Sequence, residues 1–111
     1  MLRGEVWQLS LERTPVTGEE GRTVVVLSSD ALSVLPLRVV VPLTHWQEVF
    51  AGSPWLVRIP PVLNSGLEQV MAADALQVRS VSSARLTRRL GDLPSRLVTE
   101  ISDAVRLVLD G

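Results

Sequence analysis

Short stretches that favour β-strands make up most of the first 80 residues. In residues 6–11, Val6, Gln8 and Ser10 alternate with the apolar side chains of Trp7, Leu9 and Leu11, which predicts a strand. Residues 23–27 form an unbroken β-branched run typical of a strand buried on both faces. Residues 37–41 predict a third strand, which Pro42 should end because proline has no N–H to donate. Three further strands are predicted at residues 55–59, 67–71 and 76–80.

The last third of the sequence has helical periodicity. Ser82 and Ser83 are placed to begin a short helix over residues 84–90, with Gly91 just past its end. Asp92 is a candidate N-cap for a longer C-terminal helix, in which Leu97, Ile101, Ala104, Val105 and Val108 fall at helical spacing. Six short strands and this helix predict a mainly β (α+β) fold. We expect a small, strongly curved antiparallel barrel with the helix against one side.

Length and composition narrow the possible classes of protein. A chain of 111 residues predicts a single domain over residues 1–111, and 46% apolar residues are many for so short a chain to bury alone. We therefore expect a subunit interface. The absence of cysteine excludes disulfides and thiolate metal sites, and a single histidine argues against a zinc site. Neither a signal peptide nor a run of ~18 apolar residues is visible, so we expect a cytoplasmic protein that does not bind membranes.

Several short sequence blocks follow one another along the chain in an informative order. The chain begins with Arg3-Gly4-Glu5-Val6-Trp7; a polar turn, residues 17–21, then leads into Arg22, and Pro42-Leu43-Thr44 follows the third apolar run. Further blocks stand at residues 64–67, 75–81, 85–86 and 90–93. In this order and spacing, over nearly the whole chain, the blocks resemble the MazF/PemK (CcdB-like) family of toxins.

The resemblance implies a fold and a function. The fold expected from it is an SH3-like barrel with a C-terminal helix, of the CcdB/MazF type. The function is that of a toxin of a type II toxin–antitoxin system: a metal-independent, sequence-selective endoribonuclease, or mRNA interferase, without a cofactor. Such an enzyme cleaves single-stranded RNA to 2′,3′-cyclic phosphate and 5′-hydroxyl ends. A homodimer and a cognate MazE-like antitoxin are the expected partners.

The chemistry of RNA cleavage explains why the family uses an arginine and a threonine. The RNA 2′-oxygen attacks the adjacent phosphorus, so an enzyme must move protons and stabilise negative charge on the phosphoryl oxygens. An arginine offers a permanently charged fork of five donors, and a hydroxyl adds a neutral hydrogen bond. The resemblance places the catalytic pair at Arg22 and Thr44.

Other candidate site residues follow from the same resemblance or lie beside this pair. The family's loop carboxylate matches either Glu19 or Glu20, and Arg3 and Gln77 match positions that line the RNA groove. His45 directly follows Thr44, but neighbours in an extended segment point to opposite faces, so we expect it to contact RNA rather than transfer protons. Trp46 could stack on an unpaired base.

Two departures from the family pattern bear on substrate preference. Thr23 stands where family members usually have proline directly after the catalytic arginine, and the turn at residues 18–21 is shorter than the common form. These departures keep open the alternative of an inactive SH3-like interaction module. A second alternative is a CcdB-type toxin that binds DNA gyrase. Residues 107–111 contain no tryptophan, which disfavours the gyrase-binding alternative.

Overall fold

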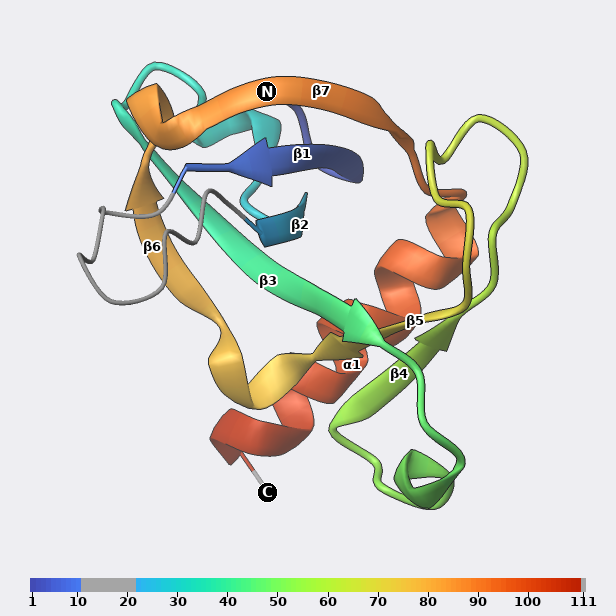
Figure 1. Ribbon diagram of the computed structural model, residues 1–111. Coiled ribbons are helices and arrows are strands. Elements are labelled where there is room, and N and C mark those ends of the chain that lie inside the picture. The colour runs from blue at the N-terminus through green and yellow to red at the C-terminus, as the bar shows by residue number, and fades with distance from the viewer. Residues whose placement is uncertain (11–21, 111) are drawn as a thin grey trace, which may run out of the picture.

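The computed structural model describes residues 1–10 and 22–110. In this part of the chain the strands form one antiparallel sheet, which the C-terminal helix covers (Figure 1). The strands are β1 (Glu5–Leu9), β2 (Arg22–Val26), β3 (Leu37–His45), β4 (Leu56–Ile59), β5 (Met71–Asp74), β6 (Arg79–Ser82) and β7 (Leu86–Asp92). The helix is α1 (Ser95–Asp110), and the 3-10 turns are η1 (Asp30–Leu32), η2 (Glu48–Phe50), η3 (Ala75–Gln77) and η4 (Ser83–Arg85).

The sheet is strongly curved but does not close. The order of hydrogen-bonded strands is β4-β5-β3-β2-β1-β7. Outside this order, β6 pairs with the first half of β3. The edge of β7 nearest β4 is occupied by a loop, where the Asp92 N–H donates to the Asn64 carbonyl at 2.8 Å. The predicted mainly β fold, with a strongly curved antiparallel sheet and a C-terminal helix, is confirmed. The sheet stays open because this loop lies where a closing strand pair would form.

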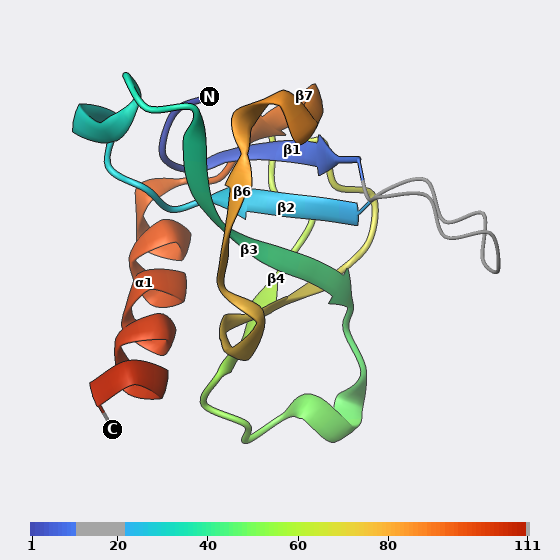
Figure 2. The same cartoon turned by 90° about the vertical axis from the view of Figure 1, so that its left-hand side faces the viewer.

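Helix α1 packs its apolar side on one face of the sheet (Figure 2). Leu97, Val98, Ile101 and Ala104 are buried, and the first three join a core cluster with residues of β1, β2, β3, β4 and β5. A second cluster on the opposite face contains Leu9, Val24, Val26, Val40, Val81 and Leu86. The predicted helical periodicity is confirmed. Within the described residues, no helix is both long and apolar enough to cross a membrane.

Three predicted boundaries are wrong. Pro42 lies inside β3, opposite Val24, at a point where β3 passes from one neighbour to another: β6 pairs with residues 37–40 and β5 with residues 43–45. Pro42 is paired with β2 on one side only, and a missing N–H costs little on the side where no partner strand is paired with it. Residues 86–92 form β7 rather than a helix, and Asp92 belongs to that strand. Helix α1 instead begins after Pro94, whose carbonyl accepts from Leu97 N–H.

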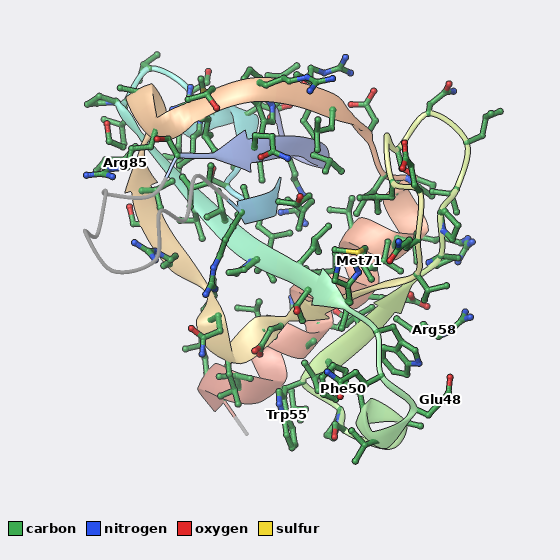
Figure 3. All side chains as sticks on the ribbon, in the orientation of Figure 1. Glu48, Phe50, Trp55, Arg58, Met71 and Arg85 are labelled. Atoms are coloured by element: carbon green, nitrogen blue, oxygen red, sulfur yellow. The ribbon has the colours of Figure 1, made fainter. Side chains whose placement is uncertain are left out.

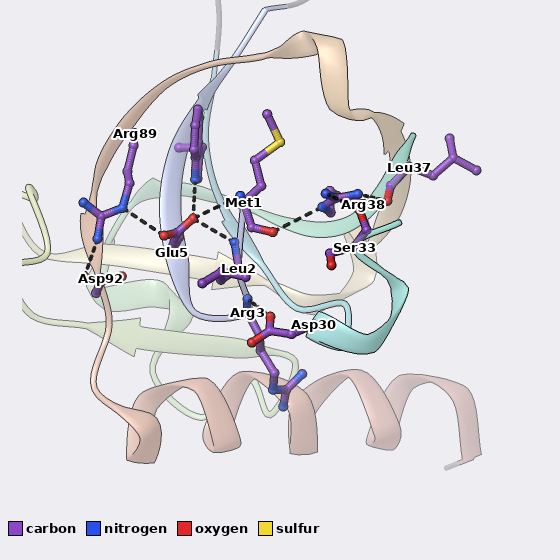
Figure 4. A network of polar contacts seen from close by, with 11 residues as sticks. Met1, Leu2, Arg3, Glu5, Asp30, Ser33, Leu37, Arg38, Arg89 and Asp92 are labelled. Carbon is purple, nitrogen blue, oxygen red and sulfur yellow. Dashed lines mark hydrogen bonds and ion pairs between the residues drawn. The ribbon is translucent and has the colours of Figure 1, made fainter. Parts of the chain in front are cut away.

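Polar contacts at the start of β1 fix the N-terminal segment (Figure 4). The Glu5 carboxylate accepts from Leu2 N–H at 2.8 Å, from Trp7 Nε1–H at 3.0 Å and from Arg89 Nε–H at 3.0 Å. Burial alone raises the pKa of Glu5, but these donors and the positive charge of the amino terminus together hold that pKa below its ordinary value. Glu5 therefore joins the N-terminal segment to β7.

Candidate active site

The register between β2 and β3 places Arg22 beside Thr44. Thr23 pairs with Leu43, so the same register one residue further sets Arg22 opposite Thr44. Paired residues of an antiparallel sheet point to the same face, with Cβ atoms about 4.5–5.5 Å apart. Both side chains are exposed, and both line a hollow of about 310 Å³ at this end of the strands. Two residues separated by 22 positions thus meet through strand pairing.

Strand β5 and turn η3 form the other side of this hollow. Ala72 pairs with Thr44, and Asp74, two residues further on, lies on the same face of the sheet. The Asp74 carboxylate oxygen Oδ1 accepts from Leu76 N–H at 3.1 Å and so caps η3. This turn brings Gln77 to the hollow, which Asp74 also lines. Arg22, Thr44 and Gln77 therefore line one hollow together with Asp74, and the roles expected for the first three stay predictions.

Asp74 is the site residue that the sequence reasoning missed. The available signal was local: an aspartate directly before a short turn is a frequent N-cap. That signal predicts a cap but not a position beside Arg22, because the pairing of β5 with β3 is not visible in the sequence pattern. The boundaries of the two strands predicted at residues 67–71 and 76–80 are also wrong. In the structure β5 is Met71–Asp74, η3 occupies residues 75–77, and β6 is Arg79–Ser82.

His45 lies at the rim where two hollows meet. It lines the hollow of Arg22 and Thr44 and also a neighbouring hollow of about 370 Å³, to which Gln8 and Arg88 contribute. Thr23 and Met71 line both hollows as well, and Met71 is seen beside the end of β3 in Figure 3. Because side chains alternate along a strand, His45 and Thr44 lie on opposite faces of β3. The role in RNA contact stays a prediction.

Arg3 does not lie beside Arg22 within the chain. The Gly4 N–H donates to the Val26 carbonyl, which places this segment at the far end of β2 from Arg22, roughly 13 Å along the strand. The Arg3 guanidinium donates to the Leu27 carbonyl, and its backbone N–H donates to Asp30. Within a single chain Arg3 therefore does not line the hollow of Arg22, and its place in the RNA groove stays a prediction.

The remaining predicted residues have different outcomes. Trp46 is half-buried and does not line the hollow; its ring meets Phe50 edge to face, with centroids 5.8 Å apart. Figure 3 shows Phe50 and Glu48 in the turn between β3 and β4, away from Met71. Stacking of Trp46 on a base stays a prediction. Glu19 and Glu20 lie outside the described residues, so the loop carboxylate is not placed.

The hollow combines donors with one carboxylate. Among the described residues that line it, Arg22 is the permanent cation, Thr44 and Gln77 supply neutral donors, and Asp74 is the carboxylate. Elsewhere in the described ranges, no three histidine, cysteine or carboxylate side chains gather as around a metal ion. A cationic fork beside a hydroxyl suits the oxygens of a phosphate group, and a carboxylate beside them can accept a proton.

Comparison with known proteins shows which family this chain resembles. The sequence profile of the PemK-like, MazF-like toxins of type II toxin–antitoxin systems matches residues 2–109. The chain is 31% identical to the endoribonuclease MazF9 of Mycobacterium tuberculosis, over 99% of this chain and 97% of that protein.

Solved structures have the same fold. A MazE–MazF complex from Deinococcus radiodurans matches with a TM-score of 0.77 and 26% identity, over 99% of this chain and 96% of that chain. The toxin MazF-mt6 of Mycobacterium tuberculosis matches with a TM-score of 0.75 and 20% identity, over 96% of each chain, which at this identity shows the fold alone. The match to the family profile over nearly the whole chain and the 31% identical relative together show that this chain belongs to the PemK-like, MazF-like toxin family.

Proposed function

We propose that the chain is the toxin of a type II toxin–antitoxin system and acts in the cytoplasm as a sequence-selective endoribonuclease. Its substrate is single-stranded RNA, including mRNA, and the products carry 2′,3′-cyclic phosphate and 5′-hydroxyl ends. The observation that carries the proposal is that Arg22 and Thr44, on the adjacent paired strands β2 and β3, line one hollow open to solvent. Family membership and the name of the 31% identical relative, an endoribonuclease, support it.

The two side chains have separate roles in this reaction. The Arg22 guanidinium binds the non-bridging oxygens of the scissile phosphate and stabilises the charge that grows on them in the transition state. The Thr44 hydroxyl donates a further hydrogen bond to one of these oxygens. Both act by charge and position, and the attacking nucleophile is the 2′-hydroxyl of the RNA itself. No metal ion is required by this mechanism.

Cleavage of a single-stranded RNA in the presence of EDTA tests the proposal directly. Wild-type protein should cut, and Arg22→Ala should lose nearly all activity, because removing one fixed donor to a developing oxyanion costs about 10²–10³ in rate and Arg22 also supplies the charge. Thr44→Ala should be substantially slower. Arg106→Ala, an exposed arginine of α1, is the matched control and should cut at the wild-type rate.

Each alternative function predicts a different result. A wild-type protein that cuts no RNA but inhibits DNA gyrase would support the CcdB-type alternative. A protein that does neither would be an inactive interaction module. Equal cleavage by wild type and Arg22→Ala would show that the site is elsewhere.

The proposal includes a cognate MazE-like antitoxin. A MazE–MazF complex is among the solved structures that this chain resembles. An acidic antitoxin segment that is disordered before binding would cover Arg22 and exclude RNA by charge and by volume. In a competition assay, antitoxin should raise the apparent Kd for RNA in proportion to its concentration. Simultaneous binding of antitoxin and RNA, without mutual weakening, would contradict this mode of inhibition.

A further inference from the structure

A second hollow adjoins the hollow of Arg22 and Thr44. Its volume is about 370 Å³, and Thr23, His45 and Met71 form a wall that both hollows share. Volumes of roughly 300–1,000 Å³ are typical of sites for small organic groups. Because the two hollows touch, an RNA chain held at Arg22 and Thr44 can place a neighbouring nucleotide in the second hollow.

Strand pairing arranges polar side chains in a row along the second hollow. Gln8 of β1 pairs with Thr23 of β2 and with Arg88 of β7. Directly paired residues point to the same face of a sheet, and all of these side chains line the second hollow. Arg88 lies two strand spacings from Thr23, about 10 Å, so the row leads away from the site of the scissile phosphate.

The other lining residues come from the segment before β5 and from the strands themselves. Leu67, Met71 and Leu90 are half-buried and pack against the main core, so they give the second hollow an apolar wall. Glu68 and Gln69 are exposed and add polar groups. A nucleobase has an apolar ring face and a polar edge, and an unpaired base is recognised through both. An apolar wall with a few polar groups around it therefore suits a base.

The polar groups of the row are available to a ligand. Within the described part of the chain, the Gln8 side-chain amide and the Arg88 guanidinium have no hydrogen-bond or ion-pair partner. The neighbouring Arg89 differs, because its guanidinium donates to the carboxylates of Glu5 and Asp92. Arg89 thus holds β7 to the N-terminal segment, whereas Arg88 is free to bind a substrate.

We propose that the second hollow binds the base next to the scissile phosphate and that Arg88 and Gln8 recognise guanine there, an inference that rests on the proposed function. The guanidinium fork matches the O6 and N7 acceptors of guanine, the commonest specific contact of arginine with a base. The Gln8 amide supplies one more donor and one more acceptor for the edge of the base. Thr23, which stands where the family usually has proline, adds a hydroxyl to the shared wall.

The base preference is measured by cutting a pool of single-stranded RNA of random sequence and sequencing both sides of each cut. Wild-type protein should enrich guanine at a position next to the cut. Arg88→Ala should lower this preference about 5–150-fold, the discrimination expected of one bidentate contact to a base. Arg88→Lys keeps the charge but not the fork, so it should lower the preference nearly as much. Arg106→Ala, on the exposed side of α1, should keep the wild-type preference.

Gln8→Ala tests the second contact of the row. This variant should also enrich guanine less than wild type does, because the amide that meets the edge of the base is lost. Gln47→Ala is the matched control, since Gln47 is exposed beside η2 and lines neither hollow. Thermal unfolding of each variant at the wild-type temperature shows that a changed preference does not come from a damaged fold.

A binding assay locates the contact on the base without requiring cleavage. The probe is an RNA with a 2′-deoxy sugar at the cleavage position and either guanine or 7-deazaguanine beside it. The two bases differ in the N7 acceptor, so wild-type protein should bind the guanine probe more tightly. Arg88→Ala should bind both probes equally.

Each outcome supports or overturns the base contact. An unchanged preference in Arg88→Ala, or equal binding of the two probes by wild type, would overturn it. A uniform loss of cleavage over all sequences would make Arg88 a phosphate contact and would also overturn it. If wild-type protein cuts no RNA, the proposed function has failed. If it cuts RNA with a preference that Arg88 does not change, only the base contact has failed.

Discussion

At the scale of single residues, the site depends on side chains that the backbone holds at fixed places on two paired strands. Arg22 begins β2 and Thr44 lies one residue before the end of β3, so both are exposed while their neighbours Val24 and Leu43 are buried. Exposure keeps the two polar side chains available to a substrate, and the buried neighbours limit how far the backbone below them can move.

Arg22→Lys tests whether charge alone is enough. Lysine keeps the charge but lacks the planar fork, so the variant should cleave RNA about 10²–10³ times more slowly than wild type. His45→Ala should lose less activity, because His45 lies on the other face of β3 from Thr44. Single-turnover rates measure both effects. An inactive His45→Ala beside an active Arg22→Lys would show that the chemistry is assigned to the wrong residue.

Glu5 makes the stability of the fold depend on pH. Because the pKa of Glu5 is lower in the folded protein than its reference value of 4.5, Glu5 stabilises the fold fully above about pH 4.5. This stabilisation should disappear as the pH falls through the lower, folded pKa. Urea unfolding of wild type and Glu5→Gln should differ by about 1–3 kcal/mol at pH 7, and this difference should shrink as the pH falls below 4.5. A difference that does not change with pH would contradict this account.

At the scale of elements, the loop over residues 62–66 is fitted directly against the backbone of β7. A Cβ atom on Gly91 would lie 2.2 Å from the Asn64 carbonyl oxygen, and one on Gly66 would lie 2.3 Å from the Leu90 carbonyl oxygen. Ser65 is fully buried, where its Oγ donates to the Val62 carbonyl at 2.7 Å and accepts from Leu67 N–H. The Asn64-Ser65-Gly66-Leu67 block of the sequence therefore has a structural cause, since this loop occupies the open edge of the sheet.

Gly91→Ala should destabilise the protein because the added methyl group meets backbone atoms that cannot move independently. We expect a loss of about 3 kcal/mol in the free energy of unfolding, measured by urea denaturation. Gly52→Ala is the control: it has a φ of +89° but no atom within 4 Å of its Cβ position, so it should lose only about 1–2 kcal/mol. Equal stability of Gly91→Ala and wild type would show that the loop can move away from β7.

At the scale of the whole molecule, one exposed apolar surface is held in place by a buried arginine. The η1 patch comprises Leu2, Leu32, Val34, Leu35 and Leu37, which are 46–88% exposed. Arg38 donates to the backbone carbonyls of Met1, Ser33 and Leu37, which Figure 4 draws, and also to that of Leu35. Several large apolar side chains exposed around one segment that is held in place are typical of a protein–protein contact.

We expect the η1 patch to form the interface of a homodimer with two-fold symmetry that buries at least ~1,000 Å². Val34→Asp should shift the protein toward monomer, because a two-fold interface would receive two buried charges. Val49→Asp is the matched control, since Val49 is 77% exposed but lies in η2. Light scattering at micromolar concentration measures the mass. A wild-type mass of 12.1 kDa would contradict the dimer, and a dimer that survives Val34→Asp would place the interface elsewhere.

The sequence alone determined the features that depend on neighbouring residues. Alternation and β-branched runs predicted β1, β2 and the start of β3, and the helical spacing from Leu97 to Val108 predicted α1. These patterns are local because burial on one face of an element repeats with its own period. The order of the sequence blocks also indicated the family, and with it Arg22, Thr44 and Gln77.

Only the tertiary structure decided the features that depend on distant segments. β3 continues through Pro42 because its second neighbour changes there, and residues 86–92 form a strand because β1 pairs with them. The same pairings bring Asp74 beside Thr44, carry Arg3 away from Arg22, and leave the sheet open where Asn64 meets Asp92. Strand pairing joins residues far apart in the chain, and its register places every side chain, so the local pattern does not contain this information.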